Sequence, residues 1–223
     1  ALGFESDCEE RFNSMLIGGE GIILVSGPTG SGKTTTLYST LNKLESPDVN
    51  IVTVEDPIEY DLDNINQAQI NTKSGVTFAS ALRSILRQDP DIIMVGEVRD
   101  EETVELGIRA ALTGHLVFST VHTNDAASGF TRLLNWNVEP FLIASTVKGI
   151  LAQRLVRRIC KECKEPHEPS REELRMVGVD EDESIKSFVG KGCLSCRNTG
   201  FKGRIGIYEL LLVDAAISEL VLE

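Results

Sequence analysis

The chain has 223 residues, which leaves room for one large domain or for one domain with a small appendage. Hydrophobic residues make up 41% of it and charged residues 25%, as in soluble globular proteins, and no apolar run approaches the roughly 18–20 residues that span a bilayer. The net charge of −12 disfavours nucleic acid as the main substrate, because binding a phosphate backbone takes clustered lysines and arginines.

A phosphate-binding loop is the first strong feature in chain order. After a polar, partly helical lead-in over 1–20, a buried strand is expected over 22–25 and a helix over 33–45, with Gly-Pro-Thr-Gly-Ser-Gly-Lys-Thr between them at 27–34. Glycines let backbone N–H groups turn around an anion, and the helix amino terminus adds partial positive charge. A chance glycine-rich turn would rarely match this motif and its strand–loop–helix context together, so the sequence predicts a nucleoside triphosphate site.

The residues of this predicted nucleotide site are Gly27, Pro28, Thr29, Gly30, Ser31, Gly32, Lys33, Thr34 and Thr35. We expect Lys33 to reach the β- and γ-phosphates and the Thr34 hydroxyl to hold Mg²⁺.

Short apolar strands then alternate with amphipathic helices. Further strands are expected over 51–54, 92–95 and 116–118, and a last long helix is expected where Ile143, Val147, Ile150 and Leu151 fall on one stripe. This alternation predicts an α/β fold with a mainly parallel sheet covered on both faces.

The composition changes after about residue 158, where cysteine, glycine, proline and charge replace the periodic pattern. We therefore predict a nucleotide-binding core over 1–158 and a small cysteine-containing subdomain over 159–200. The remaining residues, 201–223, are expected to form a return strand around 204–210 and a helical segment over 214–223.

Carboxylates follow two of the expected strands. Glu97 comes just after the strand 92–95, at the edge where open α/β sheets bind ligands, so it is the predicted base that positions or deprotonates water. The alternative is that Glu97 only caps the next helix. Gly96 fills the position where an aspartate usually precedes such a glutamate, so Mg²⁺ would rely more on Thr34, water and other carboxylates.

Glu55, Asp56 and Glu59 form a second acidic cluster after the strand 51–54. Glu55 and Glu59 are predicted to hold the waters of Mg²⁺ or the attacking water, although Asp-Pro at 56–57 is also a common turn. His122 lies at the carboxyl end of the strand 116–118 and is predicted to sense the γ-phosphate. His115, at the start of that strand, would lie at the opposite edge, and either histidine could instead be an ordinary core residue.

Four of the five cysteines form two Cys-x-x-Cys pairs, at 160–163 and 193–196. In a nucleotide-binding chain without a signal peptide, this spacing favours a metal over disulfides. Zn²⁺ prefers four tetrahedral thiolates, so Cys160, Cys163, Cys193 and Cys196 are the predicted ligands of a structural zinc; reduced, unliganded cysteines are the alternative. The basic stretch 154–164 beside the first pair is equally well explained as a solvated helix end and loop.

Four stretches together resemble the secretion ATPases of type II secretion and type IV pilus assembly. They are GPTGSGKTTTLY (27–38), VEDPIEY (54–60), LRSILRQDPDIIMVGEVRD (82–100) and IRAALTGHLVFSTVHTNDA (108–126), which are similar in order to that family's Walker A, Asp box, atypical Walker B and His box. The resemblance covers essentially the whole chain.

This resemblance implies a RecA-like core that assembles into a homo-hexamer and uses ATP and Mg²⁺ to drive a membrane platform protein and its pilus or pseudopilus. It gives the matching roles to Lys33, Thr34, Glu55, Glu97 and His122, and it likens Arg204 to a family arginine near the nucleotide. The tetracysteine insert is similar to that of the assembly and secretion branch, which retraction relatives lack. The implied location is cytoplasmic, with peripheral recruitment to the inner membrane.

The resemblance also implies an N-terminal domain that closes over the nucleotide, for which the 26 residues before the loop leave no room. We therefore expect an excised motor core whose intrinsic activity is low. Two other functions stay open from the sequence: a RecA-like nucleic-acid motor, against which the acidic balance argues, and a regulatory module that binds nucleotide and zinc without turnover.

Overall fold

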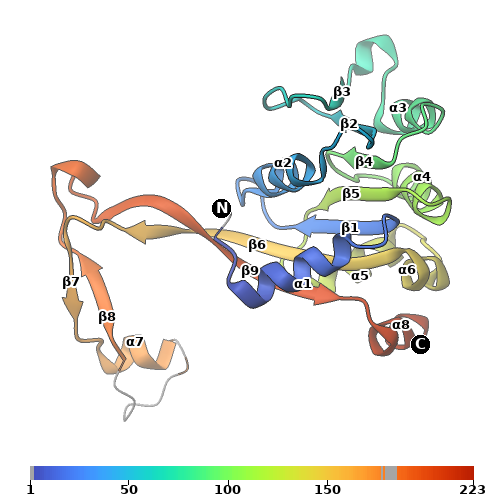
Figure 1. Ribbon diagram of the computed structural model, residues 1–223. Coiled ribbons are helices and arrows are strands. Elements are labelled where there is room, and N and C mark those ends of the chain that lie inside the picture. The colour runs from blue at the N-terminus through green and yellow to red at the C-terminus, as the bar shows by residue number, and fades with distance from the viewer. Residues whose placement is uncertain (1–2, 177, 179–184) are drawn as a thin grey trace. The chain divides into compact units, whose positions relative to one another are not determined.

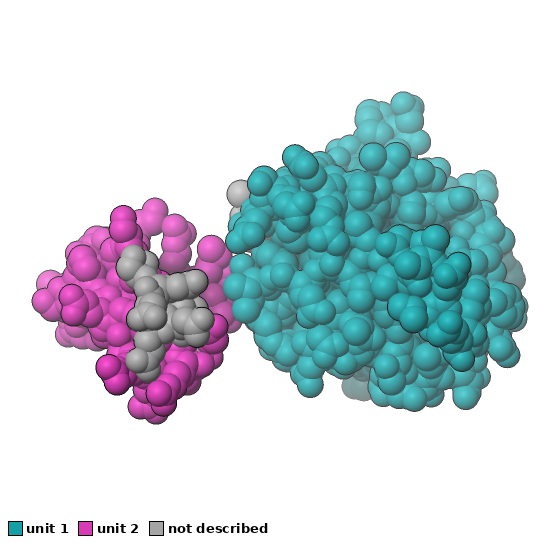
Figure 2. Space-filling model, turned by 90° about the horizontal axis from the view of Figure 1, so that it is seen from below, with its two compact units in different colours: residues 1–154, 206–223 teal, residues 155–205 magenta. Residues whose placement is uncertain are grey.

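The computed structural model describes residues 3–176, 178 and 185–223, and these form two compact units. Unit 1 comprises residues 1–154 and 206–223, and unit 2 comprises residues 155–205 (Figure 2). Part of the predicted cysteine subdomain, at 177 and 179–184, and residues 1–2 of the predicted core lie outside the described residues.

Unit 1 is built on a sheet of seven strands in the order β3-β2-β4-β5-β1-β6-β9 (Figure 1). Parallel pairing joins β1 to β5 and β6, β2 to β3 and β4, and β4 to β5. The strands are β1 (Gly21–Ser26), β2 (Ile51–Glu55), β3 (Asn66–Gln69), β4 (Ile92–Val95), β5 (Leu116–Val121), β6 (Val147–Ile159) and β9 (Phe201–Leu212). The predicted α/β class with a mainly parallel sheet is confirmed.

Helices cover both faces of this sheet, which explains why its central strands are continuously apolar. Ile23 and Val25 of β1 pack with α1 (Ser6–Leu16) and α2 (Lys33–Leu44) on one face. Ile22 and Leu24 point to the other face, because successive side chains of a strand alternate. That second face carries α3 (Phe78–Ile85), α4 (Glu101–Leu112), α5 (Ala127–Asn135), α6 (Pro140–Thr146) and α8 (Ala215–Leu222).

The expected long helix over 143–151 is wrong. The helix α6 ends at Thr146, and β6 begins at Val147 and runs between β1 and β9. Val147, Ile150 and Leu151 are all buried in this strand. A strand enclosed on both faces is apolar at nearly every position, so its sequence also satisfies a helical spacing over one or two turns.

Unit 2 is formed around an antiparallel pair of short strands, β7 (Lys164–His167) and β8 (Ser187–Gly190). It also contains the outer parts of β6 and β9, the helix α7 (Arg171–Met176) and a 3₁₀ turn at Leu194–Cys196. In the described part of the chain, no helix is both long and apolar enough to cross a membrane.

Candidate nucleotide-binding site

The loop between β1 and α2 has the backbone of a phosphate-binding loop. Gly27, Gly30 and Gly32 have φ angles of 146°, 77° and 91°, which side-chain-bearing residues rarely adopt. A Cβ on Gly27 would also come within 2.6 Å of Ser31 Oγ. Both the conformation and the close approach therefore require glycine at the first position of the loop.

The Lys33 ammonium lies over the loop. Its Nζ donates hydrogen bonds to the carbonyl oxygens of Gly27 at 2.8 Å and Pro28 at 3.2 Å. Burial lowers the pKa of Lys33, and the nearby Glu97 carboxylate partly opposes this shift. Thr34 and Thr35 follow in the first turn of α2, where Thr34 is half-buried and Thr35 exposed.

A buried glutamine on β6 holds the loop in place. The Gln153 amide donates to the Ser31 carbonyl at 2.7 Å, and its oxygen accepts from Thr36 Oγ1 at 2.8 Å. Gln153 is 2% exposed, so both bonds are shielded from water. Ser31 Oγ is buried and has no hydrogen-bond partner among the described residues, which makes it a free donor inside the loop. This hydroxyl, together with the backbone N–H groups of the loop, could donate hydrogen bonds to an anion such as a phosphate.

Glu97 lies just after the carboxyl end of β4, in a segment that forms hydrogen bonds with the two neighbouring strands, β2 and β5. Gly96 N–H donates to Val54 O at 2.8 Å, Thr120 Oγ1 donates to Gly96 O at 2.7 Å, and Val98 N–H donates to Thr120 O at 3.0 Å. A Cβ at Gly96 would lie 3.3 Å from Val54 O. A side chain at this position would therefore be in tight contact with the neighbouring strand β2.

Four charged or titratable side chains meet beside the loop: Lys33, Glu97, Arg99 and His122. His122 Nε2 lies 3.7 Å from Glu97 Oε2, while Glu97 Oε1 forms an ion pair with the Arg99 guanidinium. Burial lowers the pKa of His122, and the positive charges of Lys33 and Arg99 lower it further. The negative charge of Glu97 raises it and so opposes part of this shift. The structure thus brings Lys33, Glu97 and His122 together.

The Glu55 side chain has its hydrogen-bond partners in a different, buried network. It is 3% exposed, and its carboxylate accepts hydrogen bonds from Tyr38 Oη, from Thr53 Oγ1 at 2.6 Å and from Gln67 Nε2 at 3.1 Å. Burial and the Glu55 carboxylate raise the pKa of Tyr38, so its hydroxyl stays protonated as the donor. Glu59 is exposed, and its backbone N–H donates to the same hydroxyl at 3.4 Å.

Two other predicted or weighed residues have no contact with this group among the described interactions. Arg204 is exposed on the part of β9 that belongs to unit 2, whereas the phosphate-binding loop belongs to unit 1. His115 precedes β5, and its Nδ1 lies 2.8 Å from the carbonyl of Ala110 in the last turn of α4. It is therefore at the edge of the sheet opposite to His122, as the sequence analysis expected.

Sequence reasoning missed Gln153 and Arg99. Gln153 gave no signal, because a single glutamine in an apolar run carries no motif. Arg99 stands two residues after Glu97 in the sequence, so a contact between their side chains could have been suspected from this spacing.

The four paired cysteines converge in unit 2. Their Sγ atoms all lie within 4.8 Å of one another, with separations of 3.9 Å for 160–193, 3.8 Å for 163–196 and 3.7 Å for 193–196. A tetrahedral site with zinc–sulfur bonds of about 2.3 Å has sulfur–sulfur edges of about 3.8 Å. The arrangement is therefore compatible with a four-thiolate zinc site.

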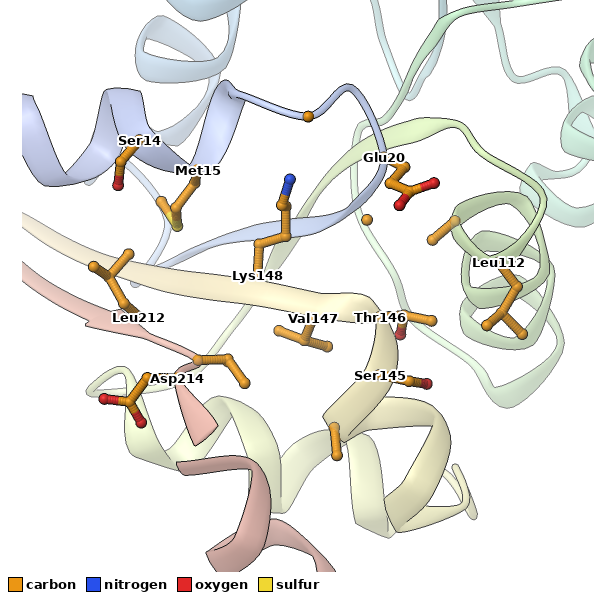
Figure 3. Close-up of a pocket in the computed structure, with 15 residues that line it drawn as sticks. Ser14, Met15, Glu20, Leu112, Ser145, Thr146, Val147, Lys148, Leu212 and Asp214 are labelled. Carbon is orange, nitrogen blue, oxygen red and sulfur yellow. The ribbon is translucent and has the colours of Figure 1, made fainter. Parts of the chain in front are cut away.

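A cavity of about 580 Å³ lies at the opposite edge of unit 1, where β1 and β6 begin (Figure 3). Glu20, Leu112, Lys148 and Asp214 are among the side chains that line it. Because parallel sheets bind nucleotides at the carboxyl ends of their strands, this cavity is distinct from the site at Lys33 and Glu97.

The sequence of this chain is similar to the sequences of known proteins. The family described as "Type II/IV secretion system protein" matches residues 1–223. The type II secretion system ATPase E of Vibrio cholerae is 51% identical over 221 residues, which are 99% of this chain and 44% of that protein. The type IV pilus assembly ATPase PilB of Thermus thermophilus is 52% identical over 218 residues, which are 97% of this chain and 24% of that protein. The chain thus spans less than half the length of these two relatives.

Solved structures show the same fold. The pilus retraction motor PilT with bound ADP has a TM-score of 0.72 and 33% identity, covering 99% of this chain and 54% of that one. The Legionella pneumophila ATPase DotB has a TM-score of 0.68 and 26% identity, covering 98% of this chain and 51% of that one.

Proposed function

This chain belongs to the type II/IV secretion system protein family, and from that premise we propose that it binds ATP at the loop 27–34 and hydrolyses it. The observation that carries the proposal is the convergence of Lys33, Glu97 and His122 at the carboxyl ends of the strands β1, β4 and β5. A cation that stabilises phosphoryl charge and a carboxylate that orients water, both beside a phosphate-binding loop, are groups that γ-phosphate hydrolysis uses.

In the proposed reaction, Glu97 orients a water molecule and accepts its proton as the water oxygen attacks the γ-phosphorus. The bond from the γ-phosphorus to its bridging oxygen breaks, and ADP and phosphate leave. Lys33 stabilises the charge that develops on the phosphoryl oxygens, and His122 senses the γ-phosphate. Mg²⁺ held by the Thr34 hydroxyl would neutralise phosphate charge. The nucleotide site would be lined by 27–35, while the assigned roles of Glu59, Glu55 and Arg204 stay predictions.

We propose further that this turnover powers type II protein secretion or type IV pilus assembly. The support is that one relative is a type II secretion system ATPase and another is a type IV pilus assembly ATPase, at similar identity to this chain. The proposal includes a homo-hexamer that works against an inner-membrane platform from the cytoplasm. The four-thiolate cluster would hold a structural zinc in the subdomain predicted over 159–200.

Two substitutions test the hydrolytic role. Glu97→Gln removes the base but keeps the size of the side chain, so we expect ATP to bind normally while turnover falls by about 10²–10⁴-fold. Lys33→Ala removes the phosphate contact, so binding itself should be lost. Titration calorimetry and Mg²⁺-dependent phosphate release, measured across protein concentrations from nanomolar to tens of micromolar, give both quantities.

Arg109→Gln is the matched control, since Arg109 forms an exposed ion pair with Glu105 on α4. A specific activity that rises with protein concentration would indicate that the ATP sites are completed by residues of a neighbouring subunit. Undiminished turnover in both Glu97→Gln and Lys33→Ala would refute the assignment.

A further inference from the structure

Arg99 lies between two carboxylates beside the nucleotide site. One nitrogen of its guanidinium pairs with Glu97 Oε1, and the other lies 3.7 Å from Asp56 Oδ2. Asp56 directly follows β2, and Glu97 follows β4, which is the neighbouring strand. The planar guanidinium fork can hold both groups at once, which a lysine ammonium on a flexible stem does poorly.

The two oxygens of Glu97 therefore face different partners. Oε1 is held by Arg99, and Oε2 lies 3.7 Å from His122 Nε2. The side chain of Glu97 is 18% exposed and that of Arg99 is 58% exposed. The Arg99 end of this ion pair is mostly exposed, and exposed arginines contribute little to folding through such pairs, so replacing Arg99 should leave the fold intact.

We propose that Arg99, anchored by Asp56, is a positioning residue that turns Glu97 Oε2 toward His122 and the phosphate-binding loop. This inference rests on the proposed role of Glu97 in hydrolysis. Arg99 acts through Glu97 rather than on the nucleotide. Without Arg99, Glu97 gains freedom about its side-chain bonds, and a misplacement of about 1 Å costs on the order of 100-fold in rate.

A double-substitution cycle tests this inference on the full 223-residue chain. Arg99→Gln is made alone and in the Glu97→Gln background, and Arg109→Gln serves as the control that loses the same charge from an exposed helical ion pair. With the native Glu97, Arg99→Gln should lower kcat by about 10- to 100-fold while KM for ATP changes by less than about threefold. In the Glu97→Gln background it should have no further effect on kcat.

The pKa of His122 gives a readout that needs no turnover. The chain has three histidines, so NMR titration resolves them, and His122→Gln assigns the signal. Loss of Arg99 removes a positive charge near His122 in both backgrounds, which raises the pKa of His122. With the native Glu97, Oε2 is also free to turn away from His122, so the pKa should rise less in the native background than in the Glu97→Gln background. Equal changes in the two backgrounds would mean that Arg99 does not orient Glu97 and would overturn the inference.

The failures of the two proposals are distinguishable. If Glu97→Gln turns over ATP at the native rate, Glu97 is not the base, and the pKa cycle alone decides whether Arg99 orients it. If Glu97→Gln is slow and Arg99→Gln slows it further, Arg99 acts on the nucleotide directly, and the inference fails while the proposed function stands.

Discussion

At the scale of the residue, Glu55 shows how burial assigns a role that a motif cannot. Its position at the carboxyl end of β2 suggested a carboxylate for magnesium waters, yet both its oxygens accept hydrogen bonds from protein donors. A buried carboxylate needs such donors, because leaving one of its oxygens unpaired costs desolvation energy. The bond from Tyr38 thus joins α2, the helix after the phosphate-binding loop, to the strand β2.

We expect Tyr38→Phe to lower the free energy of unfolding by about 1–3 kcal/mol, because it removes a donor from a buried carboxylate. Urea unfolding followed by circular dichroism measures this change. Tyr60→Phe is the control, since Tyr60 packs edge-on against Tyr38 but is 55% exposed. If Glu55→Gln abolished turnover without loss of stability, the catalytic role predicted for Glu55 would be supported over the structural one.

At the scale of the element, β6 serves the site more than its sequence indicates. It pairs with β1, the strand that leads into the phosphate-binding loop, and it carries Gln153 beneath that loop. The neighbouring Arg154 donates to the carbonyl oxygen of Asn124 at 2.9 Å, in the segment that follows His122. One strand therefore positions both the loop and the histidine segment.

Gln153→Ala should weaken ATP binding about tenfold, because the Ser31 carbonyl and the Thr36 hydroxyl both lose their partner and the loop loosens. Calorimetric titration with a non-hydrolysable ATP analogue measures the affinity. Lys148→Gln changes an exposed contact at the other end of β6 and should leave the affinity unchanged. Equal affinities in Gln153→Ala and the unchanged chain would show that the loop is rigid without this clamp.

At the scale of the whole molecule, the two units differ in how they are held together. Unit 1 buries two continuous apolar clusters, one on each face of its sheet. Among the described residues of unit 2, only Cys160, Leu174, Cys196 and Gly200 are buried. A core this small does not stabilise a domain, so folding of unit 2 should depend on the metal that its four thiolates fit.

We expect the purified chain to contain one equivalent of zinc, measured by atomic emission. Cys196→Ser should lose the metal and make residues 155–205 sensitive to limited proteolysis, while unit 1 keeps its thermal transition. Cys8→Ser is the control, because Cys8 lies on α1 outside the cluster. A protease-resistant, metal-free unit 2 would contradict a structural zinc.

The sequence by itself determined the features whose chemistry is local. The glycines and lysine of 27–34, the alternation of strands and helices, and the spacing of the cysteine pairs each follow from residues close together in the chain. The fold class and the meeting of Glu97 with His122 followed from one further rule, that parallel strands present their carboxyl ends at the same edge.

Only the tertiary structure decided what depends on contacts between distant segments. Residues 147–151 form a strand because β1 and β9 enclose them, although their spacing also suits a helix. Gln153 clamps a loop that lies 122 residues earlier, and Glu55 is enclosed by a tyrosine 17 residues before it. Burial and hydrogen-bond partners belong to the packed chain as a whole, so no window of sequence contains them.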